Sequence, residues 1–352
     1  MNNSSNNKDH NLKLLCKILF SEFGYVTYYE VKLRTKSYIE ALRIHDISDV
    51  DVYACNFLPD MTFQSIGAEC KSGESSALDE VYKFTGVIDY FHIDKGYFIK
   101  KKIHQNARQV AEKMKLSCYT EAELRKLLLG LNIIIEKQIK IEHARYTKLH
   151  NSIKSQKKIN GNIVNYLTFD YWNKENWRNI HNIIYFLGNQ KSGELFPETD
   201  ISQKIVCYYI LELFALSVLR NIGEAMIVNF SDIKQALKVS LYGGAEALSE
   251  KRQIYDLVNQ ALGENKKFSP VWEDDFVNLS SRFSDHTKDS SKIIHLLQSV
   301  REDAFYSNKV EILPKLLRNY SDLTRKFVQD LMQFISNHSQ LDIKIFDEFM
   351  KI

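Results

Sequence analysis

The chain has 352 residues, of which 44% are hydrophobic and 26% are charged. This composition is ordinary for a folded globular protein and excludes wholesale disorder, and the length favours two domains over one. The formal net charge is only +3, so any surface that binds nucleic acid has to be local.

The cysteines, the start of the chain and its longest apolar run bear on where the protein works. The five cysteines are odd in number and widely spaced without a CxxC pair, which argues against a zinc site and a disulfide framework and favours a reducing cytoplasm. The polar start, MNNSSNNKDH, does not resemble a secretory signal. The apolar run over residues 205–219 contains Glu212 and is too short to span a bilayer. We therefore expect a cytoplasmic protein without a membrane partner.

The first part of the chain predicts a disordered tail over residues 1–10 and an α/β domain over residues 11–120. Helical spacing of apolar residues distinguishes its helices, whereas alternation and a high content of Val, Tyr and Thr distinguish its strands. The expected elements, in chain order, are a helix over 12–23, strands over 25–33, 49–57 and 62–70, a helix over 76–91, a strand over 96–99 and a helix over 103–115.

The second part, residues 121–352, predicts an all-α domain. Helical patterns follow one another there, and Thr120 is a candidate N-cap for the first of them. Residues 152–162 are polar and basic and contain an Asn-Gly pair, so they form either a linker or a loop within the helical part. We expect this domain to mediate homodimerisation or contact with a partner protein.

The residues that carry chemistry begin in the strand predicted over residues 49–57. Alternate residues of a strand share a face, so Asp49 and Asp51 are expected on one face and Val50 and Val52 on the other. Asp49 either supports a site at Asp51 or, as a residue at a strand entry, caps a turn.

The following strand brings a second carboxylate and a lysine. Glu69 and Lys71 share a face by the same alternation. A turn at Pro59 and Asp60 would form a hairpin and place Asp51 opposite Glu69, with Cβ atoms roughly 4.5 to 5.5 Å apart. Carboxylates this close repel each other unless a cation lies between them, and hard oxygen ligands suit Mg²⁺ or Mn²⁺. Lys71 would then orient the attacking water or stabilise charge in the transition state.

An Asp in an apolar strand followed by Glu-x-Lys in the next strand resembles the PD-(D/E)XK nuclease superfamily, and more closely its Mrr-like, restriction-endonuclease-like branch. The resemblance implies that Asp51 and Glu69 are metal ligands, that the backbone carbonyl of Cys70 is a candidate further ligand, and that Lys71 is the catalytic lysine. It also implies a nuclease dependent on Mg²⁺ or Mn²⁺ that hydrolyses DNA, in bacterial restriction or antiviral defence.

The chain departs from the family pattern at the first helix. Many relatives carry an additional acidic residue near the start of that helix, a region that Asp9, His10 and Asn11 occupy here. Glu22 is the only carboxylate within the predicted helix, and binding of a second metal ion requires that Glu22 reach the site. Lys83, on the helix that follows the Glu-x-Lys strand, is a candidate contact for a substrate phosphate.

Two other interpretations of these residues stay open. The hairpin could be an ordinary surface feature in which Glu69 and Lys71 form an ion pair, or the domain could be a catalytically weak or inactive nuclease fold that binds nucleic acid or a partner protein as a scaffold. The basic residues 100–102 either follow a phosphate backbone or lie on a solvated face. Affinity for a metal ion separates an enzyme from a scaffold, because a decayed site keeps the fold and loses the ion.

Overall fold

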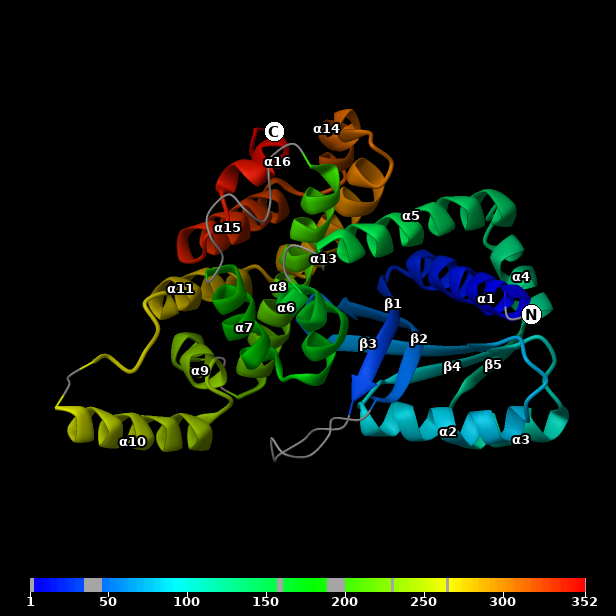
Figure 1. Cartoon of the computed structure of the whole chain (residues 1–352), viewed down its shortest axis with the longest axis horizontal. Helices are drawn as coiled ribbons and strands as arrows, with labels where there is room; N and C mark the ends of the chain where they lie inside the picture. The colour runs from blue at the N-terminus through cyan, green and yellow to red at the C-terminus, as the bar shows by residue number, and fades with distance from the viewer. Residues whose placement is uncertain are drawn as a thin grey trace. The chain divides into compact units, whose positions relative to one another are not determined.

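The chain divides into two compact units in the structure, a computed structural model that describes residues 3–34, 46–156, 161–188, 200–228, 231–263 and 266–351. We call the first the sheet unit; it comprises Met1–Asn56, Gln64–His150 and Asn165–Asn173. The second, the helical unit, comprises Phe57–Phe63, Asn151–Val164 and Lys174–Ile352. Figure 1 labels their helices and strands.

A five-stranded mixed sheet with strand order β1-β2-β3-β4-β5 is the centre of the sheet unit. Strand β1 runs antiparallel to β2, whereas β3, β4 and β5 run parallel to one another. The strands are β1 (Val26–Arg34), β2 (Asp46–Phe57), β3 (Phe63–Lys71), β4 (Lys95–Lys100) and β5 (Ser117–Thr120). The α/β class expected for this part of the chain is confirmed. Strand β5 was not predicted, because its four half-buried residues are too few to show a pattern.

Helices cover both faces of this sheet (Figure 1). One face carries α1 (Asn3–Glu22), α4 (Glu121–Gly130) and α5 (Ile135–Gln156), and the other carries α2 (Ala77–Tyr90) and α3 (Gln105–Lys113). Apolar side chains of α1, α4 and α5 form one core with residues of the strands, among them Val52, Ala54, Ala68 and Cys70. Two short helical turns, η1 (Tyr166–Asp170) and η2 (Tyr171–Asn173), complete the unit beside β1.

Two expected boundaries differ from the structure. The first helix begins at Asn3, so the residues from there to His10, which were expected to be a disordered tail, continue the helix that the apolar residues after them anchor. The sheet unit also extends beyond residue 120, because Leu124, Leu128 and Ile135 belong to the core that α1 forms with the sheet. A helical pattern in a sequence shows that a helix has an apolar face, but not which core that face joins.

The segment over residues 152–162 is mostly helical where the structure describes it. Helix α5 continues to Gln156, and α6 (Gly161–Asn165) begins after residues 157–160, which lie outside the described part of the chain. The described residues of this segment are therefore helical, and the linker or loop expected over 152–162 is not found among them.

The centre of the helical unit is α8 (Ile201–Val228), which contacts α7, α9, α11, α13 and α15. In the described part of the chain it is the one helix long and apolar enough to cross a membrane, and 94% of its most apolar window is buried within the structure, as in the core helix of a soluble protein. The other helices are α7 (Asn176–Gly188), α9 (Ile233–Ser240), α10 (Ala245–Leu262), α11 (Glu273–Asp285), α12 (Thr287–Ser290), α13 (Ile293–Ser299), η3 (Val300–Phe305), η4 (Val310–Ile312), α14 (Leu313–Leu317), α15 (Asp322–His338), η5 (Ile343–Phe346) and α16 (Asp347–Met350).

Candidate functional site

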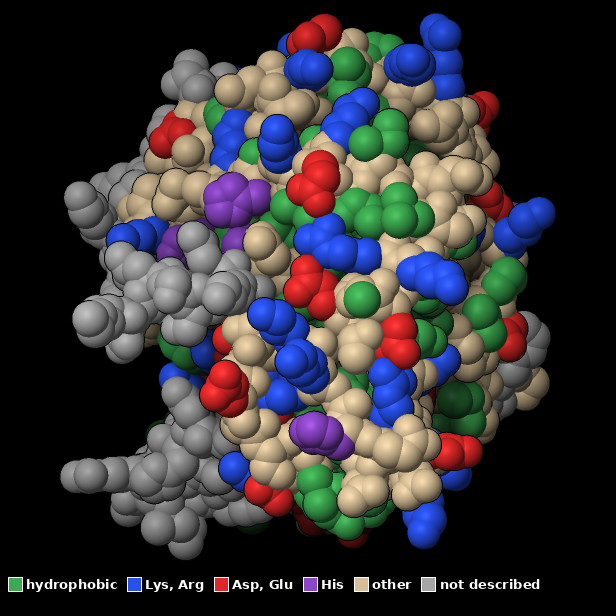
Figure 2. All heavy atoms as spheres, turned by 90° about the vertical axis from the view of Figure 1, so that its right-hand side faces the viewer, with side chains coloured by type: hydrophobic (Ala, Val, Ile, Leu, Met, Phe, Trp, Pro, Cys, Tyr) green, Lys and Arg blue, Asp and Glu red, His purple; other side chains and the backbone are tan. Residues whose placement is uncertain are grey.

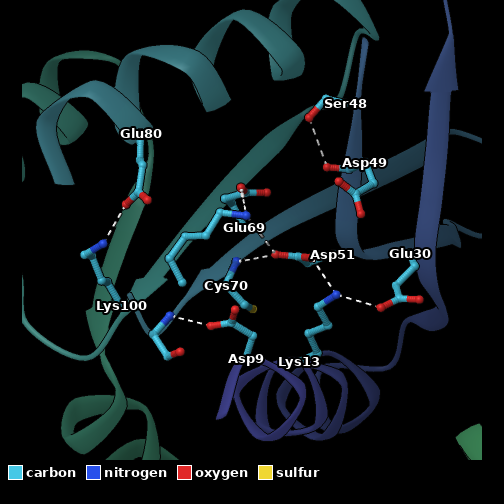
Figure 3. Close-up of polar contacts among 12 residues, drawn as sticks. Asp9, Lys13, Glu30, Ser48, Asp49, Asp51, Glu69, Cys70, Glu80 and Lys100 are labelled. Atoms are coloured by element: carbon cyan, nitrogen blue, oxygen red, sulfur yellow. Dashed lines mark hydrogen bonds and ion pairs between the residues drawn. The ribbon is translucent and has the colours of Figure 1, made fainter. Parts of the chain in front are cut away.

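Asp51, Glu69 and Lys71 come together on the neighbouring strands β2 and β3 (Figure 3). The Lys71 Nζ atom lies 2.6 Å from Glu69 Oε1 and 4.0 Å from Asp51 Oδ2. The side chain of Asp51 is 5% exposed and that of Glu69 is 14% exposed, whereas Lys71 is 35% exposed. The two carboxylates are therefore largely shielded from water, and Lys71 is the member of the set that solvent reaches most easily.

The connection between β2 and β3 turns where the sequence predicted. The Leu58 N–H donates to the Thr62 carbonyl at 2.9 Å, and the Asp60 carboxylate accepts from the Thr62 N–H at 2.9 Å. Strands joined by so short a connection run antiparallel. Beside the site, the Cys70 N–H donates to Asp51 Oδ2 at 2.8 Å, which fixes the orientation of the Asp51 carboxylate.

Burial and neighbouring charges shift the pKa values of Glu69 and Lys71 on β3. Burial and the nearby charge of Asp51 raise the pKa of Glu69 to about 7, although Lys71 acts in the opposite direction. Burial lowers the pKa of Lys71, but the charges of Glu69 and Asp51 outweigh this effect and raise it to about 12. Lys71 is therefore cationic at neutral pH, and its charge does not outweigh the effect of burial and of Asp51 on the pKa of Glu69.

Asp9 is a further carboxylate at this edge of the sheet, on helix α1. Its Oδ1 accepts a hydrogen bond of 2.5 Å from the N–H of Ser72, the residue that follows Lys71 (Figure 3). Because α1 begins at Asn3, Asp9 lies inside the helix, which corrects the expectation that Glu22 is the only carboxylate there. Glu22 is exposed at the other end of α1, roughly 20 Å along the helix axis from Asp9. Asp9 was not assigned to the site from the sequence, although the acidic residue that many PD-(D/E)XK nucleases carry near the start of this helix could have pointed to it.

The other residues named from the sequence lie in different surroundings. Asp49 pairs with Lys32 of β1 at 3.2 Å. Lys83 is exposed on α2, and within the described residues no hydrogen bond or ion pair joins it to the site. Lys100 is buried and pairs with Glu80 at 2.7 Å, so it does not belong to a solvated basic stretch that could follow a phosphate backbone (Figure 3).

The alternation predicted for β2 fails at Asp51. Val52 packs in the core that includes α1, whereas a Val50 methyl group lies 3.3 Å from the place that a Cβ on Gly67 would occupy, beside α2. Two residues that were expected on one face thus point to opposite faces. The alternation is interrupted at Asp51, which lies opposite Glu30 of β1. Glu30 has a left-handed φ of 51°, a value that a regular strand does not contain.

The donor set suits a divalent cation. Mg²⁺ is usually held by one or two carboxylates, with water and substrate phosphate as its other ligands. Asp51 and Glu69 meet this requirement from adjacent strands, with the Cys70 carbonyl as a third candidate oxygen. No group of three His, Cys, Asp or Glu side chains is arranged to hold an ion within the described ranges, so an ion here would depend on water and substrate for its remaining ligands.

Comparison of the chain with protein-family models, with curated proteins and with solved structures finds no match. The resemblance to PD-(D/E)XK nucleases therefore rests on the site residues and on the order of the elements around them. What the protein does has to be inferred from this geometry.

Proposed function

We propose that the sheet unit is a metal-dependent nuclease that hydrolyses phosphodiester bonds, with DNA as its substrate. The observation that carries the proposal is the meeting of two shielded carboxylates, Asp51 and Glu69, with the more exposed Lys71 on adjacent strands. The pKa of Glu69, raised to about 7 by burial and by the charge of Asp51, supports it further, because a bound cation would favour the ionised form of this shielded carboxylate.

Each group has a part in that reaction. Asp51 and Glu69, with the Cys70 carbonyl, would hold Mg²⁺ or Mn²⁺, and such an ion supplies Lewis acidity and neutralises charge during phosphodiester hydrolysis. The Cys70 N–H keeps the Asp51 carboxylate in one orientation. Lys71 carries its charge at neutral pH and is accessible to solvent, so it can orient a water molecule or stabilise negative charge on the phosphate.

The surface charge bears on how a nucleic acid would be held. Figure 2 shows Lys and Arg side chains interspersed with Asp and Glu side chains over the described part of the face in view. No continuous area there carries charge of one sign only. The net charge of +3 agrees with this mixture. We therefore expect few phosphate contacts on this face and a correspondingly shallow dependence of DNA affinity on salt concentration.

Resemblance to the restriction branch supports a role in bacterial restriction or antiviral defence, with the helical unit mediating homodimerisation or contact with a partner protein. One observation favours a second candidate, a nuclease-like scaffold that binds nucleic acid or a protein without cutting. Lys71 already pairs with Glu69, as it would in a fold that has lost its ion. The two candidates differ in metal affinity and in cleavage.

Cleavage of plasmid and single-stranded DNA with Mg²⁺ and with Mn²⁺ tests the proposal. We expect the wild type to cut, and Glu69→Gln and Lys71→Met to lose about a hundredfold or more of that activity. Lys32→Met is the matched control. It removes a lysine from the adjacent strand β1, and this lysine pairs with Asp49 and not with a residue of the site. A wild type that binds neither ion and cuts neither substrate would refute the nuclease, and DNA binding without cleavage would support the scaffold.

A further inference from the structure

Lys13 of α1 pairs with Oδ1 of Asp51, whereas the backbone N–H of Cys70 binds the other oxygen, Oδ2. Its Nζ lies 2.8 Å from Asp51 Oδ1 and 2.7 Å from Glu30 Oε1, so it joins carboxylates from two neighbouring strands (Figure 3). Burial lowers the pKa of Lys13, but the charges and hydrogen bonds of Asp51 and Glu30 outweigh burial and raise it above its usual value. The proposed ion site thus already contains a cation supplied by the protein.

Glu30 is placed to bind the Lys13 ammonium group. Its neighbours on β1 pair with the neighbours of Asp51 on β2, so the two carboxylates face each other across the strands, where like charges repel. Its other oxygen, Oε2, accepts a hydrogen bond of 3.1 Å from the Tyr146 hydroxyl of α5. The left-handed φ of 51° at Glu30 is a strained conformation for a residue other than glycine, and such strain is concentrated at functional sites.

We propose that Lys13 is an internal counter-cation that competes with a divalent ion for Asp51, and that Glu30 retains Lys13 when the ion binds. The inference rests on the proposed function, because it takes Asp51 and Glu69 as the ion ligands. In the absence of metal, Lys13 keeps the shielded Asp51 carboxylate paired. When an ion binds, Lys13 keeps its contact with Glu30 and releases Asp51. Lys13 and Glu30 are therefore positioning residues that set the affinity for the ion.

The charges around the site give this arrangement a second consequence. Lys13, Lys71, Asp51, Glu69 and Glu30 carry one net negative charge when all are ionised. A divalent ion adds two positive charges to this group, and a phosphodiester, which is itself a monoanion, offsets one of them. Ion and substrate should thus each favour the binding of the other.

Binding of Mn²⁺ to the full-length protein without DNA tests the inference, with free Mn²⁺ measured by electron paramagnetic resonance. Lys13→Met removes the competing ammonium group, and we expect it to bind Mn²⁺ at least tenfold more tightly than the wild type. Lys13→Gln, which keeps a donor for Asp51, should bind more tightly as well and serves if the Met variant does not fold. Lys32→Met removes the same charge two residues along β1 from Glu30, where Lys32 pairs with the partly exposed Asp49 and not with Asp51, and it is expected to change the affinity by no more than about twofold.

A double-mutant cycle separates retention of Lys13 from simple electrostatics. Glu30→Gln removes a negative charge, so it should weaken Mn²⁺ binding in the wild-type background on either view. If Glu30 also acts by retaining Lys13, the same change weakens Mn²⁺ binding clearly less in the Lys13→Met background than in the wild type. An equal effect in both backgrounds would overturn the role of Glu30.

The failure of this inference can be distinguished from failure of the proposed function. If the wild type binds Mn²⁺ and neither Lys13 variant binds it more tightly, competition by Lys13 is refuted and the nuclease proposal stands. If neither the wild type nor the Lys13 variants bind the ion, the ion site is refuted and the inference is overturned with it.

Discussion

Replacing Glu69 by Gln is expected to stabilise the metal-free sheet unit at alkaline pH and to have little effect at acid pH. The reason is the environment of the carboxyl group, which lies within reach of Asp51 and is largely shielded from water. Gln has nearly the same shape and its amide oxygen can still accept a hydrogen bond from Lys71, but it never ionises.

The size of the effect follows from the pKa of Glu69, which is raised from 4.5 to about 7. A carboxyl whose pKa is raised on folding contributes stability that is fully present below pH 4.5 and is lost as the pH rises through 7. Each pKa unit corresponds to roughly 1.4 kcal/mol, so the wild type should lose about 3 kcal/mol relative to Glu69→Gln between pH 4.5 and pH 8.

Hydrogen exchange of peptides from β2 and β3, measured in a chelator near pH 5 and near pH 8.5, reports the opening of this unit specifically. Wild type and variant are compared at the same pH, so the intrinsic pH dependence of exchange cancels. About 3 kcal/mol corresponds to roughly a hundredfold slower exchange in Glu69→Gln at the higher pH. Glu123→Gln is the control, because a hydrogen bond from Arg108 lowers the pKa of Glu123 to about 2 and leaves it ionised at both pH values.

A constant difference between wild type and Glu69→Gln across this pH range would refute the reasoning, because it would mean that folding does not raise the pKa of Glu69. A saturating concentration of Mg²⁺ gives a second test. The ion should stabilise the wild type and remove the advantage of the variant, since it favours the ionised carboxylate and is bound by the folded protein alone.

Three further substitutions test the packing of the two units. Gly96→Ala would place a Cβ 2.3 Å from Leu116 Cδ2, and we expect it to lower the free energy of unfolding by about 1 to 3 kcal/mol in urea titrations. Arg301→Met removes the paired hydrogen bonds to the fully buried Glu212, so calorimetry should show a loss of about 3 to 5 kcal/mol, most of which a second change of Glu212 to Met restores. Thr120→Ala removes a capping box at the start of α4 and should cost about 1 kcal/mol in urea titrations. Unchanged unfolding midpoints would contradict the contact named for each residue.

The order of elements and the meeting of three site residues could be predicted from the sequence because they depend on local rules. Alternation along β3 places Glu69 and Lys71 on one face, and the turn at Asp60 brings that strand back beside Asp51. The switch from alternation to helical spacing likewise predicted α2 after β3. These signals lie within a few tens of residues, so the chain's own periodicity determines them.

The surroundings of those residues were decided by the tertiary structure. Lys13 and Asp9 reach the site because α1 packs across strands that follow it by tens of residues, and helical spacing does not reveal which strand a helix crosses. The φ of Glu30 breaks the alternation at Asp51, and no residue type in the sequence signals a left-handed glutamate. The sequence thus determined that Asp51, Glu69 and Lys71 meet, whereas long-range packing added Lys13 and Glu30 and determined which cation the Asp51 carboxylate pairs with.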